Sequence, residues 1–337
     1  MEQFLLTLAQ YFRFNRQRAY AIGGTVLLGL VGFFLAVTRI FGPSPDYISY
    51  DIFFDLVRTE GWNTLTESRF EPGFSVAAVI LTKLFSFNAV VYACIVFATM
   101  LLKGATIRAY SSSHQIFFAV SVFYLVRYFP LHELTQLRAA VAIALILMGA
   151  VLIWQDKFFY GLLICALSLS FHMSVVAVIP ALFFTSEKRW KVVLAALGVF
   201  AFVLVFSGLV TGYLGNLIKI VEAYQTDGFG DIKPKRFAVQ LLVDWFFIFA
   251  SLLMWKKLSS IMKRIVLLEL IGMAVFYGGI DFAVVAHRMR EIYSVFWLIF
   301  VANGLAHRNT RLLCMGFISV SVVFYSYVFF FSGTFFV

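Results

Sequence analysis

Apolar runs long enough for a membrane-crossing helix recur from one end of this 337-residue chain to the other. A helix needs about 17 to 25 predominantly apolar residues to cross a bilayer. Hydrophobic residues make up 62% of the chain and charged residues only 13%, whereas a soluble domain is roughly half apolar. The sequence therefore predicts an all-α, polytopic integral membrane protein with no room for a sizeable soluble domain.

The apolar runs predict a single membrane domain, 1–337, formed by a bundle of about 11–12 membrane helices. Three runs, 72–86, 158–171 and 173–185, are too short to span comfortably, so at least one of them should be re-entrant or interfacial. The first run lacks a small-residue cleavage site and is predicted to be a retained span rather than a signal peptide. The predicted helices lie at 20–41, 72–86, 88–107, 115–130, 137–154, 158–171, 173–185, 190–212, 237–256, 263–282, 289–306 and 311–331.

Basic residues gather in short connections, and this predicts the orientation of the chain because Lys and Arg accumulate on the cytoplasmic side. The clusters RFNRQR, SEKRWK and HRNTR are examples. If they face the cytoplasm, that side holds 15 basic residues, including Lys103, and four acidic residues, including Glu269. The pattern predicts a cytoplasmic N-terminus, provided that segment 72–86 enters from outside without a full crossing. The net charge of +10 then reflects topology rather than nucleic-acid binding.

The same topology places two long connections, 42–72 and 212–236, on the outer face. The connections predicted for the cytoplasmic side are short. Long connections carry binding and catalytic residues more often than short ones. We therefore expect the chemistry of this protein on its outer face.

Cationic side chains from distant parts of the chain reach this predicted outer level, which suits an anionic ligand. Arginine is preferred where a phosphate group is gripped through two parallel hydrogen bonds. Arg138 is the first candidate, because the small residues of AAVAIA that follow it favour tight helix packing and turn it toward the bundle. An arginine that only snorkels at a helix end is the alternative. The other cations at this level are Arg69, Lys233, Lys235, Arg236, Arg288 and Arg290.

Histidines and carboxylates at the same level are candidates for proton transfer and for binding sugars. His172 lies inside an otherwise apolar stretch of about 25 residues, and ionisable residues within a membrane are functional candidates by default. A hydrogen-bonded structural histidine is the alternative. The carboxylates and the remaining histidines of this group are Asp51, Glu71, His132, Glu133, Asp281 and His287.

Simpler interpretations remain open for several of these charged sites. His132 and Glu133 could form a solvated pair in a connection. The cluster HRMR, which contains His287, could anchor a helix end. The cations at 233–236 could contact lipid headgroups.

Several chemistries have no signature in this chain. It has no Walker loop, no GxGxxG motif after a strand, no HExxH and no GxSxG. Asp46 and Asp51 are five residues apart, so they would point to different faces of a helix. The three cysteines lie in apolar segments and form no CxxC pair, so they are interpreted as small packing residues. We expect neither a metal site nor a disulfide.

An ordered set of short motifs resembles the EpsG family, a branch of the Wzy-like polysaccharide polymerases. The motifs are PDYISYD, FEPGF, an arginine followed by AAVAIA, FHMSVV, and an arginine followed by EIYSVFWLI. They cover roughly residues 20–330 by order and spacing. Two positions depart from the family pattern, in which RQ and FHxSA are frequent: here Ala139 follows Arg138, and Val175 replaces the final alanine. Neither departure removes an ionisable group.

The resemblance implies a GT-C-like glycosyltransferase on the outer face of the cytoplasmic membrane. Its donor would be a glycan on a polyprenyl-diphosphate carrier, and its acceptor the glycan on a second carrier. No cofactor or metal is implied. The implied partners are these substrates, the lipid bilayer and, further, a chain-length regulator or a flippase, but no nucleic acid.

Such a transfer places negative charge on the leaving diphosphate, so positioned arginines stabilise the transition state more than the ground state. The acceptor hydroxyl must also lose a proton, which calls for a histidine or a carboxylate. His172 is the first candidate for this base and Glu71 the second. For the diphosphate we assign Arg138, Arg288 and Arg69, with Arg290 and Arg236 as further candidates; for the glycan we assign Asp51, His132, Glu133, Asp281 and His287.

Two other functions remain open at this point. A membrane O-acyltransferase acting on sugars also uses histidine and arginine, but the cytoplasmic connections look too short to offer a path for an acyl donor. A flippase for lipid-linked glycans would need a cation-lined path through the membrane. Most of the charges here gather on one side, and no internal repeat of the kind found in transporters is visible.

Overall fold

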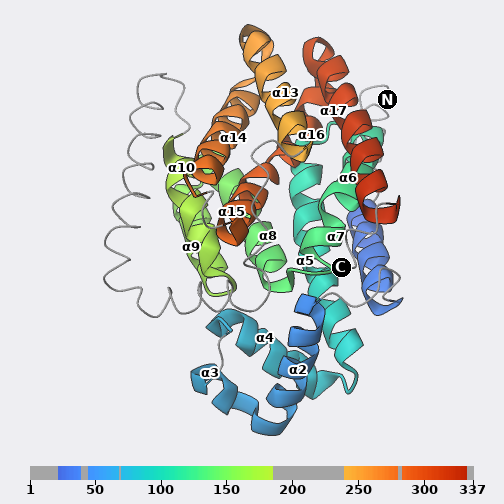
Figure 1. The fold of residues 1–337 in the computed structure, drawn as a ribbon, viewed down its shortest axis with the longest axis vertical. Helices are drawn as coiled ribbons and strands as arrows, with labels where there is room; N and C mark the ends of the chain where they lie inside the picture. The colour runs from blue at the N-terminus through green and yellow to red at the C-terminus, as the bar shows by residue number, and fades with distance from the viewer. Residues whose placement is uncertain (1–21, 39–44, 68–69, 185–238, 280–282, 332–337) are drawn as a thin grey trace, which may run out of the picture. The chain divides into compact units, whose positions relative to one another are not determined.

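The computed structural model describes residues 22–38, 45–67, 70–184, 239–279 and 283–331, and all regular structure within them is helical (Figure 1). Three of these helices are long and apolar enough to cross a membrane: Asn88–Tyr110, Leu137–Trp154 and Arg308–Phe329. Shorter apolar helices accompany them, among them Ile22–Thr38 and Pro72–Leu84. The predicted class, an all-α polytopic membrane protein, is confirmed. The predicted helix 190–212 and the connection 212–236 lie outside the described residues.

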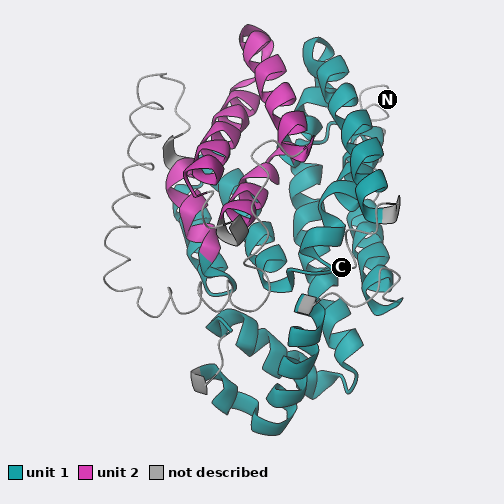
Figure 2. Ribbon diagram, in the orientation of Figure 1, with its two compact units in different colours: residues 1–173, 298–337 teal, residues 174–297 magenta. Residues whose placement is uncertain are grey.

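Residue contacts divide the chain into two compact units, residues 1–173 with 298–337 and residues 174–297 (Figure 2). The first unit contains the helix Ile22–Thr38, α2 (Pro45–Glu60), η1 (Gly61–Asn63), α3 (Thr64–Glu67), α4 (Pro72–Leu84), α5 (Asn88–Tyr110), α6 (His114–Arg127), α7 (Phe129–His132), α8 (Leu137–Trp154), α9 (Phe158–Leu169), most of α16 (Trp297–Ala306), α17 (Arg308–Ser326) and η5 (Tyr327–Phe331). The second contains most of η2 (Met173–Ala177), α10 (Val178–Phe184), α13 (Val239–Leu253), η4 (Trp255–Lys257), α14 (Ser260–Gly278) and α15 (Ala283–Ser294).

Helix α8 forms the centre of the first unit and is buried along most of its length. The stretch AAVAIA is buried throughout, as its small residues predicted. Helix α8 packs closely on α9, because a Cβ atom on Gly149 would lie only 2.5 Å from Cys165 Sγ and 3.0 Å from the Gly161 carbonyl oxygen. The short turn between the two helices includes Asp156 at φ 61°, a left-handed conformation that Asp tolerates better than most residues.

Much of the connection 42–72 is helical rather than irregular. Helix α2 turns one face toward α4, and this face buries Tyr47, Tyr50, Phe53, Phe54 and Val57. Rings from α2 contact Phe74 of α4; the centroids of Tyr50 and Phe74, for example, are 5.5 Å apart. Burial of an aromatic face stabilises this part of the first unit by the hydrophobic effect.

Two predictions made from the sequence are wrong in detail. The segment 289–306 is not one helix, because α15 ends at Ser294 and α16 begins at Trp297. The amide of Phe296 donates to the Tyr293 carbonyl oxygen across this break at 3.1 Å, and no Gly or Pro announces it in the sequence. Lys103 and Glu269, which were counted with the cytoplasmic charges, are both buried within helices. Their removal from the count leaves the excess of positive charge unchanged.

Candidate active site

Glu71 stands at the beginning of α4, where the local sequence fixes its backbone. Pro72 occupies the first turn of the helix, a position that proline favours because its missing N–H would have no helical partner there. The residue before a proline avoids the helical region, and Glu71 is accordingly extended at φ −65° and ψ 147°. Its side chain makes no capping hydrogen bond to α4, so the carboxylate is available to other parts of the chain.

The start of α4 lies directly against the turn that follows α9. The amide of Gly73 donates to the Ser170 carbonyl oxygen at 2.8 Å. A Cβ atom at position 73 would lie 2.8 Å from that same oxygen, so the approach requires glycine. The turn carries His172, whose amide donates to the Ser168 carbonyl oxygen at 3.1 Å. This contact brings Glu71 and His172 together although they are 101 residues apart in the sequence.

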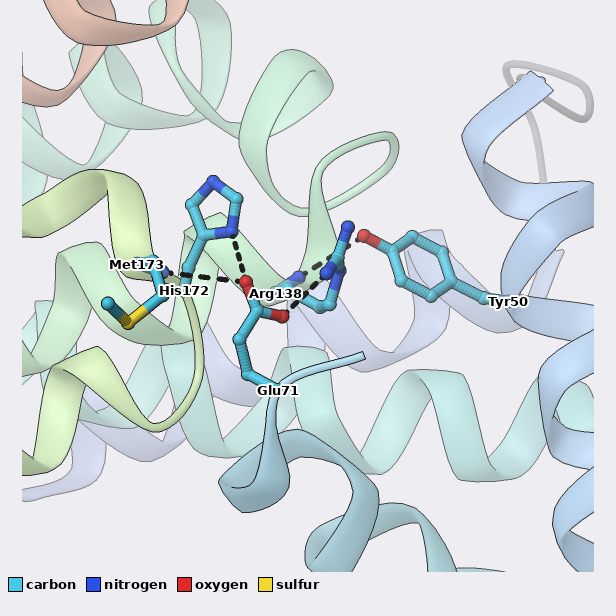
Figure 3. Close-up of polar contacts among 5 residues, drawn as sticks. All are labelled: Tyr50, Glu71, Arg138, His172 and Met173. Atoms are coloured by element: carbon cyan, nitrogen blue, oxygen red, sulfur yellow. Dashed lines mark hydrogen bonds and ion pairs between the residues drawn. The ribbon is translucent and has the colours of Figure 1, made fainter. Parts of the chain in front are cut away.

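The carboxylate of Glu71 contacts two other predicted site residues, Arg138 and His172 (Figure 3). Its Oε2 atom accepts a hydrogen bond from Arg138 Nη1 at 2.5 Å, and its Oε1 atom lies 3.1 Å from His172 Nδ1. The Met173 amide also donates to Oε1, at 3.4 Å. The exposed fractions of the three side chains are 14% for Glu71, 20% for Arg138 and 11% for His172. The cluster is therefore largely shielded but still reachable from outside the protein.

The guanidinium of Arg138 is held from two further sides. It lies over the ring of Phe70, with Cζ 4.6 Å from the ring centroid, a favourable cation–π arrangement. The backbone N–H of Arg138 donates to the hydroxyl of Tyr50 on α2, at 3.4 Å. The Nε atom of Arg138 is buried and has no hydrogen-bond acceptor among the described residues. Because 20% of the Arg138 side chain is exposed, an anionic oxygen from outside the protein can reach the guanidinium.

The charges of this cluster determine its protonation. Burial alone would raise the pKa of Glu71, but the hydrogen bond to His172 and the positive charge of Arg138 outweigh it and lower the pKa to about 2. Glu71 is therefore a carboxylate at neutral pH and accepts a hydrogen bond from the Nδ1–H group of His172. A histidine that donates from Nδ1 in its neutral form carries its free lone pair on Nε2, so Nε2 is the atom of His172 that could accept a proton. Burial raises the pKa of the neighbouring Tyr50 phenol, so it stays protonated.

His132 and Glu133, two predicted glycan ligands, are fully buried just before α8. Glu133 Oε1 lies 2.5 Å from Lys103 Nζ on α5, and both side chains are 0% exposed. The Tyr92 hydroxyl donates to the Glu133 carbonyl oxygen at 2.8 Å. Neither ring nitrogen of His132 has a hydrogen-bond partner within the described part of the chain. This ion pair connects α5 to the turn that leads to Arg138.

Of the remaining predicted site residues, Asp51 belongs to the first unit, and the others lie in the second unit or outside the described residues. Asp51 lies on α2, and its carbonyl oxygen accepts a hydrogen bond from Asn88 Nδ2 at 3.3 Å. In the second unit, the Arg290 guanidinium forms a buried ion pair with Asp244. The ring centroids of His287 and Phe276 are 5.1 Å apart. Arg288 is half-buried on the same helix, α15. Arg69, Arg236 and Asp281 lie outside the described residues.

The described side chains include no group of three or more His, Cys, Asp or Glu residues that could hold a metal ion. The contacts of Tyr50, Phe70 and Gly73 with this site were not predicted. Lys103 was also missed as an interior charge. A lysine inside an apolar run is the kind of residue that marks a buried polar contact in a membrane protein, and this signal was present in the sequence.

We expect Gly73→Ala to destabilise the protein by about 1–3 kcal/mol, the usual cost of forcing an extra methyl group into a close contact. The added Cβ would press on the Ser170 carbonyl oxygen and separate α4 from the turn that carries His172. Thermal unfolding of the purified protein in detergent measures the effect. Gly316→Ala on α17 is the matched control, because a Cβ there meets no atom within 4 Å. Equal melting temperatures for the two variants would contradict the prediction.

Comparison with known proteins adds one match. The model of the EpsG family matches residues 25–337, which is nearly the whole chain. No curated protein and no solved structure matches it.

Proposed function

Because the chain belongs to the EpsG family, a family of Wzy-like polysaccharide polymerases, we propose that it lengthens a glycan carried by a polyprenyl diphosphate. The donor glycan leaves its diphosphate carrier and is joined to the end of an acceptor glycan on a second carrier. The cluster of Glu71, Arg138 and His172 is the observation that supports this chemistry. It supplies one cation for the leaving group and one base for the acceptor within a single shielded site.

Arg138 is proposed to bind the diphosphate of the donor. The bond between the anomeric carbon and the diphosphate oxygen breaks, and the electron pair stays on that oxygen. Negative charge therefore grows on the diphosphate during the reaction, and a fixed guanidinium stabilises the transition state more than the ground state. Phe70 and Glu71 hold this guanidinium in place, and 20% of the Arg138 side chain remains exposed to a ligand.

His172 is proposed to activate the acceptor. The acceptor hydroxyl oxygen attacks the anomeric carbon, and its proton passes to Nε2 of His172. Glu71 holds the opposite ring nitrogen, Nδ1, and stabilises the imidazolium that forms, as the carboxylate does in other His–carboxylate pairs. A pKa of about 2 makes Glu71 itself a poor base at neutral pH, so we favour His172 over Glu71 for this role. The mechanism uses no metal ion.

The setting of the reaction is part of the same proposal. We place the cluster on the outer face of the cytoplasmic membrane, with a cytoplasmic N-terminus, and propose a chain-length regulator or a flippase as a partner in addition to the bilayer. Arg288, Arg69 and Arg236 remain proposed further contacts to the diphosphate. Arg290 would have to leave Asp244 in order to join them. Asp51, Asp281 and His287 remain proposed contacts to the glycan. His132 and Glu133 would need to become exposed to take part.

The function is tested by polymerisation in vitro. Lipid-linked glycans extracted from the source organism after deletion of this gene should contain the substrate that accumulates. The purified chain in lipid nanodiscs should convert this extract into a ladder of longer glycans on a gel and release polyprenyl diphosphate. The double variant Arg138→Ala, His172→Ala should form no ladder. If the unmodified chain forms no ladder and releases no polyprenyl diphosphate, the proposal is wrong.

A further inference from the structure

Helix α2 has an exposed apolar stripe on the side that does not pack on α4. Ile48, Ile52 and Leu56 are 52%, 65% and 39% exposed. They are spaced by four residues and therefore lie on one face of the helix. Because the opposite face is also apolar and buried, α2 is apolar on two sides. A helix in water would place polar residues on its free face.

Contacts with α5 place α2 beside the first two turns of a membrane-spanning helix. Asn88, the first residue of α5, donates from Nδ2 to Asp55 Oδ1 at 2.7 Å and accepts at Oδ1 from Arg58 Nη2 at 2.8 Å. Tyr92, one turn further along, has its ring centroid 4.9 Å from that of Tyr47. Figure 1 shows α2 next to this end of α5. Helix α2 therefore lies level with the end of a span rather than beyond it.

The chain around α2 supports the same depth. Six residues, 39–44, join the apolar helix Ile22–Thr38 to α2, and they can bridge at most about 20 Å. Helix α4 exposes its own apolar stripe, Val76, Ile80 and Leu84, again with a spacing of four residues. Next to these helices, Lys83 Nζ lies 5.2 Å from the ring centroid of the exposed Trp62. Tryptophan and lysine are typical anchors at the membrane–water interface.

We propose that α2 is an interfacial membrane helix, with Ile48, Ile52 and Leu56 inserted at the boundary between lipid headgroups and acyl chains. An apolar helix face gains free energy at this boundary by leaving water. Asp51 and Asp55, the acidic residues nearest the stripe, contact Asn88 of α5 through the Asp51 carbonyl oxygen and the Asp55 carboxylate. The bilayer is the occupant of this surface.

The position of α2 in the membrane also affects the position of Arg138, and this step of the proposal rests on the proposed function. The buried face of α2 carries Tyr50, whose hydroxyl accepts a hydrogen bond from the Arg138 amide. The depth of α2 in the bilayer therefore sets the depth of Arg138. A diphosphate attached to a lipid carrier lies at the level of the headgroups, so α2 holds Arg138 at the height where its ligand arrives.

Site-directed spin labelling of the full-length chain tests the docking. Cys94, Cys165 and Cys314 are replaced by alanine, one nitroxide is attached at Ile52→Cys, and the protein is placed in nanodiscs of phosphatidylethanolamine and phosphatidylglycerol. Val323 is exposed within the apolar span of α17 and is the lipid reference. Asn309, exposed in the polar stretch HRNTR, is the water reference. The label at position 52 should resemble that at 323, with high accessibility to oxygen and low accessibility to a water-soluble nickel chelate.

Two other outcomes of the accessibility measurement would overturn the proposal. High accessibility to the nickel chelate, as expected at position 309, would place α2 in water. Low accessibility to both reagents would mean that protein covers the stripe, either a second copy or another segment of this chain. The spin-label measurement needs no polymerase activity, so it tests the insertion of α2 into the membrane even if the proposed function is wrong.

A second experiment compares the turnover of two variants to test whether the depth of α2 affects the reaction. Ile52→Glu should lower turnover in nanodiscs by about tenfold to a hundredfold, as small misplacements of catalytic groups do, whereas Ile52→Leu should match the unmodified chain. In detergent micelles, where no bilayer sets the depth of α2, the two variants should have similar turnover. An equal defect of Ile52→Glu in micelles and nanodiscs would contradict the proposed role in depth setting.

Discussion

His172→Ala is expected to lower polymer turnover by about 10²- to 10⁴-fold, the usual effect of losing a general base. The variant removes the ring nitrogen that would accept the proton of the acceptor hydroxyl. Glu71 is a poor replacement, because its carboxylate remains paired with Arg138, whose positive charge still lowers its pKa. Turnover of lipid-linked glycan by purified protein at matched concentration measures the effect.

His307→Ala is the matched control for this variant. His307 is exposed before α17, and its side chain makes no capping hydrogen bond. We expect this variant to retain the turnover of the unmodified chain. If His172→Ala also retains it at normal protein abundance, His172 is a structural residue held by Glu71, and the base must be sought elsewhere.

Arg138→Lys is expected to lower turnover by roughly tenfold to a hundredfold. A guanidinium can offer two parallel hydrogen bonds to a phosphate group, whereas an ammonium offers a point charge. A lost charge-assisted hydrogen bond is worth about 1.5–3 kcal/mol, and about 1.4 kcal/mol corresponds to tenfold in rate. Arg138→Ala should be more severe, because it also removes the ion-pair partner of the shielded Glu71 carboxylate.

The alternative, an arginine that only marks the end of a membrane helix, predicts that lysine serves equally well, since both side chains snorkel. Arg308 provides the comparison, because it is exposed at the start of α17 as Arg138 stands at the start of α8. Arg308→Lys should leave turnover unchanged. If Arg138→Lys behaves in the same way, the diphosphate is bound by other arginines, such as Arg69, Arg236 or Arg288.

Several features of the site could be anticipated one residue at a time. His172 is a candidate because ionisable residues within a membrane are functional candidates by default. Arg138 is a candidate because small residues follow it, and Glu71 because it lies at the same predicted outer level. The buried position of AAVAIA followed from its small residues. The sequence offered no way to decide which partner each charge would find. Arg138 and Glu71 are 67 residues apart, and Lys103 and Glu133 are 30 residues apart.

The errors share one cause, because each concerned a residue whose environment is made by another segment. The sequence predicts a cytoplasmic charge at Lys103, whereas the structure pairs this lysine with Glu133 in the interior. The predicted helix 289–306 lacks a helix breaker, yet the structure divides it after Ser294. Tyr293, next to this break, packs against Gly272 and donates from its hydroxyl to the Ala177 carbonyl oxygen at 2.7 Å. These contacts cannot be read from local periodicity.

That the chain is a helical membrane protein follows from local properties, because the length and apolarity of each run decide whether it can cross a bilayer as a helix. The sequence also indicated Glu71, Arg138 and His172 as candidates for one site on the predicted outer face. Only the tertiary structure decided the pairings. The glycine at position 73 lets α4 approach the turn after α9, and that approach places one carboxylate between Arg138 and His172. Such a site depends on the packing of three distant segments, and packing is a property of the folded chain rather than of any one segment.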